Sequence, residues 1–322
     1  MSNQTKVLVT GCAGFIGSNL VDDLLSQNLN VVGIDNLSTG KKEFLKNAEK
    51  NPRFEFFKID LFEDSEISHA FIGCDAVYHL SANADVRFGS EHPAVDLEQN
   101  TITTHKVLEA TRKAGIKKFV FSSTGSVYGE PLLIPTPENA PFPLQTSLYG
   151  ASKLACEALI QAYSESFEIQ AWIFRFVSIL GQRYTHGHIV DFLIQLTQNP
   201  SNLKVLGNGH QKKSYLNIAD CIRGINLGVK SSQDRINVLN LGVDGICEVK
   251  DSIGWIVDEL GINPKVHYGT ETRGWIGDNP IIHLDTQKMR KLGWEPTFTI
   301  EESVRETVQY LLKNQHLLGN KS

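Results

Sequence analysis

Short apolar runs alternate with longer polar–apolar segments through the first half of the chain. The apolar runs are rich in β-branched and aromatic residues and lie at 6–11, 30–35, 54–60, 74–80 and 117–123. Segments of helical length, such as 15–27 and 97–115, lie between several of them. Alternating strand and helix signals predict an α/β fold, in which a parallel sheet is covered by helices on both faces.

Polar or small residues follow several of the predicted strands. In sheets of this kind, ligands bind outside the carboxyl ends of the strands. The residues expected at those ends are Gly11, Asp35, Asp60, Leu80 and Ser122.

The strict alternation fades after residue 176. Residues 200–221 resemble an irregular β segment with a turn, whereas 248–261 and 300–315 have the pattern of helices. We therefore expect a main domain over 1–175 and a smaller mixed α/β lobe over 176–322 that is interleaved with it.

Composition narrows the possible classes of function. The 322 residues include 41% hydrophobic and 21% charged residues, and the net charge of −5 provides no basic field for nucleic acid or anionic membranes. No run reaches the ~18–20 apolar residues that span a bilayer, and the first residues lack the pattern of a signal peptide. Five scattered cysteines, an odd number, are typical of reduced thiols. We expect a cytoplasmic protein.

Histidine and cysteine spacing gives no metal motif. His186 and His188 lie close together, but a polar loop that enters a helix explains them better than a ligand pair. No metal site is predicted.

A glycine-rich turn follows the first predicted strand. Gly11, Gly14 and Gly17 form a GxxGxxG pattern, in which the backbone approaches a pyrophosphate at a helix amino-terminus. Asp35 ends the second strand, where a carboxylate accepts hydrogen bonds from the adenosine ribose and repels a 2′-phosphate. No arginine follows within 36–40, although Lys41 and Lys42 come soon after. The pattern favours NAD over NADP.

Tyr149 and Lys153 are four residues apart and separated only by small residues. On a helix both side chains lie on one face. Alone, this spacing more often marks an ordinary helix start with a surface lysine.

Five segments together resemble a known family. They are 10–17 (TGCAGFIG), 35–40 (DNLSTG), 78–87 (YHLSANADVR), 121–130 (FSSTGSVYGE) and 149–153 (YGASK). In this order they are similar to the extended short-chain dehydrogenase/reductase family, in its NAD-dependent sugar-nucleotide epimerase branch, with a pattern close to the UDP-glucose (galactose) 4-epimerases. Residues 205–220 and 273–280 look like that branch's substrate-binding segments, so the resemblance covers the whole chain.

The resemblance implies a Rossmann-type doubly wound sheet that holds NAD, with a nucleotide-diphosphate sugar bound between the sheet and the lobe. The implied reaction oxidises the sugar C4 hydroxyl, lets the 4-keto sugar turn over, and returns hydride to the opposite face. It further implies a homodimer that pairs amphipathic helices around 93–113 and 148–167.

Tyr149 is the implied base, supported by Lys153 and Thr124. A free tyrosine has a pKa of ~10, and a charge at ~4 Å supplies on the order of 4 kcal/mol at an effective dielectric near 20. We therefore expect Lys153, helped by the charge of the nicotinamide, to lower the pKa of Tyr149, and Thr124 to steer the substrate proton.

Gly125 and Ser126 follow Thr124, where related dehydratases and decarboxylases carry carboxylates. This leaves a 4-epimerase, with a 4-dehydrogenase that releases its keto sugar as the close alternative. A non-catalytic dinucleotide-sensing protein on the same fold is a third possibility, against which the intact Tyr149–Lys153 pair argues.

The resemblance assigns further residues one at a time. Cofactor contacts are expected from Gly11, Gly14, Phe15, Ile16, Gly17, Asp35, Asn36, Asp60, Leu61, Leu80, Ala82, Asn100, Ser122, Tyr149 and Lys153. Substrate contacts are expected from Thr124, Ser126, Ser178, Lys213, Arg273 and Asp278. A loop salt bridge is the alternative explanation for Arg273. Ser178 and Ile282 depart from the family pattern, so the nucleotide and the sugar both stay open.

Overall fold

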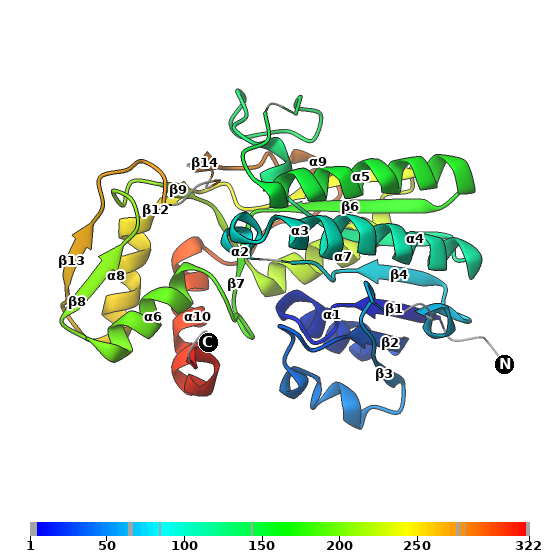
Figure 1. Cartoon of the computed structure of the whole chain (residues 1–322), viewed down its shortest axis with the longest axis horizontal. Coiled ribbons are helices and arrows are strands. Elements are labelled where there is room, and N and C mark those ends of the chain that lie inside the picture. Colours follow the sequence, from blue (N-terminus) through cyan, green and yellow to red (C-terminus); the bar gives the residue numbers. More distant parts are fainter. Residues whose placement is uncertain are drawn as a thin grey trace.

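The computed structural model describes residues 5–63, 67–83, 85–142, 144–274, 277, 279 and 281–319. A seven-stranded parallel sheet runs through its centre in the order β11-β6-β5-β4-β1-β2-β3 (Figure 1). Its strands are β1 (Lys6–Thr10), β2 (Asn30–Asp35), β3 (Phe54–Lys58), β4 (Ala76–His79), β5 (Lys118–Thr124), β6 (Gln170–Phe176) and β11 (Ile236–Leu241). The chain winds outward in both directions from the β1–β4 boundary, so the predicted fold class is confirmed.

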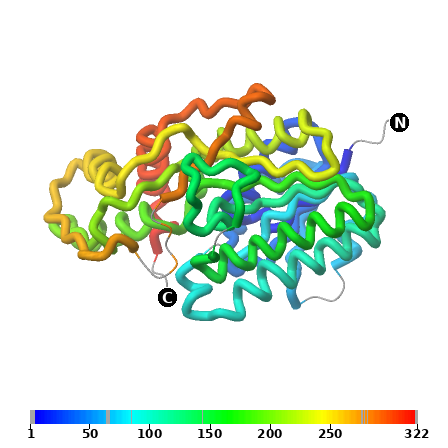
Figure 2. Tube along the Cα trace, turned by 90° about the horizontal axis from the view of Figure 1, so that it is seen from above, coloured from blue at the N-terminus to red at the C-terminus, as the bar shows by residue number. Residues whose placement is uncertain are grey.

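Helices cover both faces of this sheet. α1 (Phe15–Ser26) and α7 (Ile218–Ser231) lie on one face, and α4 (Thr103–Lys113) and α5 (Leu148–Phe167) lie side by side on the other (Figure 2). Strand side chains alternate between the faces: Val7 and Val9 join one apolar core, whereas Leu8 joins the other. Burial on both faces explains why inner strands such as β1 and β4 contain continuous apolar runs.

The segment expected to be one amphipathic helix over 93–113 has three parts. α3 (Pro93–Asp96) leads into a π-helical turn, η4 (Leu97–Ile102), and then into α4. Such π turns are often found at functional sites. Here the turn lies against α5 and carries Asn100, whose side chain is buried.

The remaining elements form the carboxyl-terminal lobe and the connections. Three small sheets pair β10 with β7, β9 with β12 and β14, and β13 with β8. The strands are β7 (Ser178–Leu180), β8 (Asn202–Val205), β9 (Lys212–Lys213), β10 (Tyr215–Asn217), β12 (Cys247–Glu248), β13 (Lys265–Tyr268) and β14 (Ile281–Ile282). The helices are α2 (Val86–Glu91), α6 (His188–Gln198), α8 (Val249–Leu260), α9 (Gln287–Lys291) and α10 (Ile300–Lys313). The 3-10 turns are η1 (Lys42–Leu45), η2 (Ala48–Lys50), η3 (Ile67–Phe71), η5 (Gly125–Tyr128) and η6 (Gln315–Leu318).

The two parts of the chain interleave. α7 and β11 follow residue 176 in sequence, yet β11 pairs with β6 at the edge of the central sheet. The domain boundary at 175 stays a prediction. None of the helices in the described ranges is long and apolar enough to cross a membrane.

Candidate active site

The first turn of the site is shaped by close backbone packing. Gly11 has a φ of +67°, and a Cβ atom there would lie 2.9 Å from the backbone nitrogen of Ser81. A Cβ atom at Gly17 would lie 2.0 Å from the carbonyl oxygen of Gly11. Gly14 precedes α1 without a side-chain cap, so the amides at the start of α1 face the turn. This glycine cradle fits a dinucleotide pyrophosphate.

Asp35 is fixed beside this cradle at the end of β2. Its Oδ2 atom accepts a hydrogen bond from the backbone nitrogen of Ala13 at 2.9 Å, and Oδ1 accepts one from Leu37 at 2.8 Å. Burial raises the pKa of Asp35 above its ordinary value, and the two backbone amides oppose this. The carboxylate is thereby oriented to accept hydrogen bonds from a ribose.

Asn36 and Asp60 extend the site along the ends of β2 and β3. Asn36 Nδ2 donates to Asp60 Oδ2 at 2.8 Å. Burial raises the pKa of Asp60, but hydrogen bonds from Asn36 and from the Glu63 and Phe62 amides outweigh it, so the pKa lies below the ordinary value. The side chain of Leu61 lies in the apolar core.

A second turn, after β4, packs against the first. Thr10 Oγ1 accepts from the backbone nitrogens of Leu80 at 3.1 Å and Ser81 at 3.2 Å. It also lies 2.7 Å from His79 Nδ1, so the hydroxyl donates to that ring nitrogen. The backbone of Leu80 and Ser81 is therefore held next to Gly11, and Ala82 follows directly along the chain.

The end of β5, which carries Thr124, meets the first turns of α5, which carry Tyr149 and Lys153. α5 begins at Leu148, because Ser147 Oγ caps it by accepting from the Gly150 backbone nitrogen at 3.0 Å. The Tyr149 and Thr124 side chains are hydrogen-bonded to each other. Lys153 is 2% exposed, and its Nζ atom donates to the carbonyl oxygen of Ser122 at 2.8 Å.

The direction in which the pKa of Tyr149 is shifted is opposite to the expectation from the sequence. Burial raises the pKa of Tyr149, and the carboxylate of Asp96 raises it further, while the hydrogen bond with Thr124 lowers it. Burial also lowers the pKa of Lys153 to about 8, against the effects of Cys156, Glu157 and Asp96. Desolvation, and not attraction to Lys153, therefore dominates the pKa of Tyr149.

Sequence analysis missed three buried charged residues near α5. Glu157 accepts from Arg175 through both carboxylate oxygens, at 2.6 and 3.0 Å, and also from Ser123. Asp96 lies at the end of α3 and is 1% exposed. The four-residue spacing from Lys153 to Glu157 was a usable signal for Glu157, whereas nothing in the sequence marked Asp96 or Arg175.

The carboxyl-terminal lobe reaches the start of α5. Lys213 Nζ on β9 donates to the carbonyl oxygen of Asn279 at 2.5 Å, and Asn279 Oδ1 accepts from Thr146 at 2.6 Å. A Cβ atom at Gly125 would lie 3.0 Å from Ile282, which places β14 beside the Thr124 turn. Lys213 is thus linked through Asn279 to the residues that precede α5, and Ile282 lies beside the turn after Thr124.

The other expected substrate residues are spread more widely. Ser126 Oγ accepts from Thr124 Oγ1 at 3.2 Å. Ser178 is exposed at the start of β7, and Arg273 forms an ion pair with Glu130. Asp278 lies outside the described residues.

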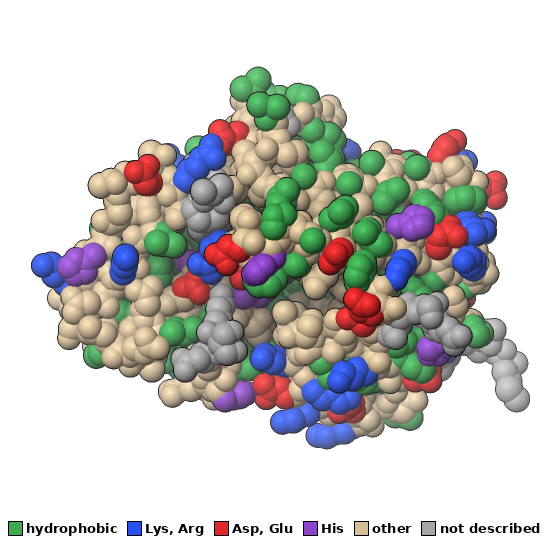
Figure 3. Space-filling view, viewed as in Figure 1, with side chains coloured by type: hydrophobic (Ala, Val, Ile, Leu, Met, Phe, Trp, Pro, Cys, Tyr) green, Lys and Arg blue, Asp and Glu red, His purple; other side chains and the backbone are tan. Residues whose placement is uncertain are grey.

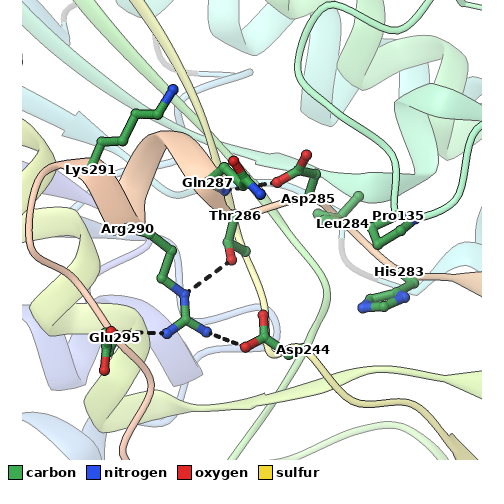
Figure 4. A pocket seen from close by; sticks show the side chains of 10 residues that line it. All are labelled: Pro135, Asp244, His283, Leu284, Asp285, Thr286, Gln287, Arg290, Lys291 and Glu295. Atoms are coloured by element: carbon green, nitrogen blue, oxygen red, sulfur yellow. Dashed lines mark hydrogen bonds and ion pairs between the residues drawn. The ribbon is translucent and has the colours of Figure 1, made fainter.

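The surface supports a site between the sheet and the lobe. Figure 3 shows this face hollowed near its centre, between the main sheet and the carboxyl-terminal lobe. A cavity of about 650 Å³ lies elsewhere, lined by residues of α9 and of the segment that precedes it (Figure 4). Its Arg290 is already paired with Asp244 and Glu295, so that cavity offers no unpaired guanidinium to an anion.

The histidines near α6 have structural partners. His188 begins α6, stacks on Tyr215, and its Nε2 atom lies 2.9 Å from Ser252 Oγ. Across the described residues, no group of three or more His, Cys, Asp or Glu side chains could hold a metal ion.

Comparison with known proteins agrees with this geometry. Residues 7–242 match the model of the NAD dependent epimerase/dehydratase family. The chain is 32% identical to a putative UDP-glucose 4-epimerase of Methanocaldococcus jannaschii, over 96% of this chain and 99% of that protein. It is 31% identical to the UDP-glucose 4-epimerase of Mycolicibacterium smegmatis, over 95% and 98% of the two chains.

Solved structures give the same result. The UDP-glucuronic acid 4-epimerase of Bacillus cereus, in complex with UDP-glucuronic acid and NAD, superposes with a TM-score of 0.88 at 29% identity, over 96% of this chain and 100% of that one. A UDP-galactose 4-epimerase superposes with a TM-score of 0.86 at 35% identity, over 96% and 99%. The chain therefore belongs to the NAD-dependent epimerase/dehydratase family.

Proposed function

We propose that this protein epimerises a UDP-linked sugar at C4, with Tyr149 as the acid–base group and Lys153 and Thr124 as its partners. The observation that carries the proposal is the meeting of these three side chains with the glycine cradle at the carboxyl ends of the central strands. The relatives named as UDP-sugar 4-epimerases supply the substrate class.

Each residue has a distinct task in the proposed reaction. NAD, when bound, supplies reversible acceptance of hydride from the sugar carbon. Tyr149 takes the proton of the C4 hydroxyl and later gives it back, which is general base and then general acid catalysis. Thr124 shares a hydrogen bond with Tyr149 and orients the hydroxyl, while Lys153 stabilises the phenolate from the next helical turn.

The chain lacks the groups that other reactions of this family would use. Gly125 and Ser126 carry no carboxylate beside Thr124, so neither loss of water nor decarboxylation has an acid or base there. The relatives favour a 4-epimerase over a 4-dehydrogenase that releases its keto sugar.

Cofactor retention is assigned to the glycine cradle, Asp35 and the residues around it. Substrate contacts are assigned to Ser126, Ser178, Lys213, Arg273 and Asp278, with Lys213 as the diphosphate-binding cation. To bind the substrate, Arg273 must leave its ion pair with Glu130.

We also propose a cytoplasmic homodimer. The five cysteines are buried free thiols, which suits a reducing compartment. Leu97 and Ile102 on η4 are 54% and 36% exposed, and they place apolar surface beside α5 for the same surface of a second copy. Light scattering at micromolar concentration tests this, and a monomer would contradict it.

The test of function compares two tyrosines of α5. Tyr149→Phe should lower UDP-sugar turnover by roughly 10²–10⁴ while bound NAD is retained. Tyr163→Phe is the matched control, because its hydroxyl bonds Glu109 Oε1 at 2.8 Å, away from the site, and its turnover should equal that of the wild type. Full activity in Tyr149→Phe would remove Tyr149 from the mechanism.

A further inference from the structure

Charged and polar groups line the buried face of α5 at four-residue intervals. Tyr149, Lys153 and Glu157 follow one another on successive turns, and the last two are 2% and 0% exposed. A buried ammonium is costly unless an anion balances it. The buried ammonium group of Lys153 therefore requires a carboxylate nearby to balance its charge.

Glu157 is already committed to another cation. Its two oxygens accept from Arg175 at 2.6 and 3.0 Å in a bidentate pair, and Ser123 donates to one of them. Bidentate arginine–carboxylate pairs are strong and fix both groups. The charge of Glu157 is therefore largely neutralised by Arg175.

Asp96 is a buried carboxylate, and among the described residues it forms no ion pair with a cation within 4 Å. Its Oδ1 atom accepts from the amides of Asn83 at 2.9 Å and Asn100 at 3.2 Å. Its Oδ2 atom is buried and has no hydrogen-bond partner among the described residues. A Cβ atom at Gly89 would lie 2.0 Å from Oδ2, so the oxygen occupies space that Gly89 leaves free.

A hydrogen-bond chain joins Asp96 to the catalytic helix. Asn100 Nδ2 donates to Asp96 and, at 2.8 Å, to Ser152 Oγ, which donates to the carbonyl oxygen of Tyr149 at 2.9 Å. Asn100 Oδ1 accepts from the backbone nitrogen of Asn83 at 2.8 Å. Asp96 thus sets the orientation of the Asn100 amide and couples the turn after β4 to the first turn of α5.

We propose that Asp96 is a positioning residue of the reaction: it is the counter-charge of Lys153 and aligns the first turn of α5 through Asn100 and Ser152. This rests on the proposed roles of Tyr149 and Lys153. The assignment follows from the charges that face one another. Arg175 balances Glu157, which leaves Lys153 and Asp96 as the remaining opposite pair, and each acts electrostatically on the other.

The titratable groups around Asp96 and Lys153 determine which pKa values the pH profile of turnover reports. Tyr149, Lys153 and Cys156 face it from α5, His79 lies below Lys153 on β4, and Asp85 precedes α2. His79 stays neutral above pH 4, because burial lowers its pKa to about 3. Removing the Asp96 charge lowers the pKa of both Tyr149 and Lys153, so both limbs of the profile move toward acid.

The experiment compares Asp96→Asn with Asp85→Asn. Asp85 is the matched control, because it lies near Asp96 but caps α2, a task that asparagine performs equally well. Asp96→Asn should move both limbs of the turnover–pH profile to lower pH by about one unit, the order of magnitude expected for the loss of one buried unit charge at an effective dielectric near 20. Asp85→Asn should leave the profile in place. An unmoved profile in Asp96→Asn, or an equal shift in the control, would overturn the proposal.

A second measurement is independent of activity. The titration of Lys153 is followed by NMR of ¹³Cε-labelled lysine, with its signal assigned by Lys153→Met, and its pKa should fall by about one unit in Asp96→Asn. If that variant does not fold, Asp96→Ser removes the charge and keeps a small acceptor. An unchanged Lys153 titration contradicts the counter-charge, whereas an inactive wild type would contradict only the proposed function.

Discussion

In the Lys153→Met variant, turnover should be limited by the ionisation of Tyr149. Burial and Asp96 raise the pKa of Tyr149 above the ordinary value of ~10, so the phenolate fraction at pH 8 is below about 1%. A positive charge on the next helical turn, about 6 Å away, supplies roughly 3 kcal/mol at an effective dielectric near 20. Its loss should lower turnover at pH 8 by about 100-fold.

The pH dependence of this variant is more diagnostic than its activity at one pH. Because the phenolate stays a minority species, the logarithm of turnover should rise by about one per pH unit from pH 8 to 10 without a plateau. The wild type should not gain over that range, because Lys153 loses its charge with a pKa of about 8. The assay is initial-rate epimerisation of a UDP-sugar with bound NAD quantified in each sample.

Lys106→Met is the matched control for this variant. Lys106 also donates to a backbone carbonyl, that of Phe62, and its Nζ atom lies 5.2 Å from the centre of the Phe62 ring. Lys153 has the same arrangement over Phe121 at 4.5 Å. The control should keep the wild-type profile. A flat profile in Lys153→Met, or the same slope in Lys106→Met, would refute the electrostatic role of Lys153.

Three further outcomes follow from the geometry. Gly17→Ala should lower both NAD retention and the melting temperature, because its Cβ atom would lie 2.0 Å from a backbone oxygen that cannot move aside; thermal melting and NAD content check this. Asp35→Ala should weaken NAD retention, measured after denaturation, and retention of NADP by the wild type would contradict the role of Asp35. Burial lowers the pKa of His79 to about 3 and of His188 to about 4. Unfolded histidines titrate near ~6.5 and bind the additional protons, so stability should fall below that pH by up to about 1.4 kcal/mol per unit for each histidine. Urea unfolding at pH 7.5 and 5.5 tests this, and His188→Gln should flatten the slope.

The central sheet was predictable because its inner strands are buried on both faces. Burial on both faces requires continuous apolar runs, which residues 7–9 and 119–121 display directly. The glycine turn was equally readable, since its packing tolerates no side chain at Gly11 or Gly17. The local sequence was therefore sufficient to predict the central sheet and the glycine turn.

Other features depend on contacts that no local pattern records. The π-helical turn has the sequence of an ordinary helix, and only packing against α5 directs Asn100 inward. β11 follows an amphipathic helix in a stretch without strict alternation, so its place at the sheet edge was not foreseen. Asp96 and Arg175 belong to residue types that are mostly exposed, and their burial depends on partners elsewhere in the fold.

The fate of the hydrogen at C4 tests the central claim most directly. The protein is incubated with a UDP-sugar deuterated at C4 in ordinary water, and the epimer is analysed by mass spectrometry. Hydride removal and return within one site predict that the product keeps its deuterium at C4, with no keto sugar released. Loss of deuterium to solvent, or accumulation of a free keto sugar, would contradict epimerisation through bound NAD.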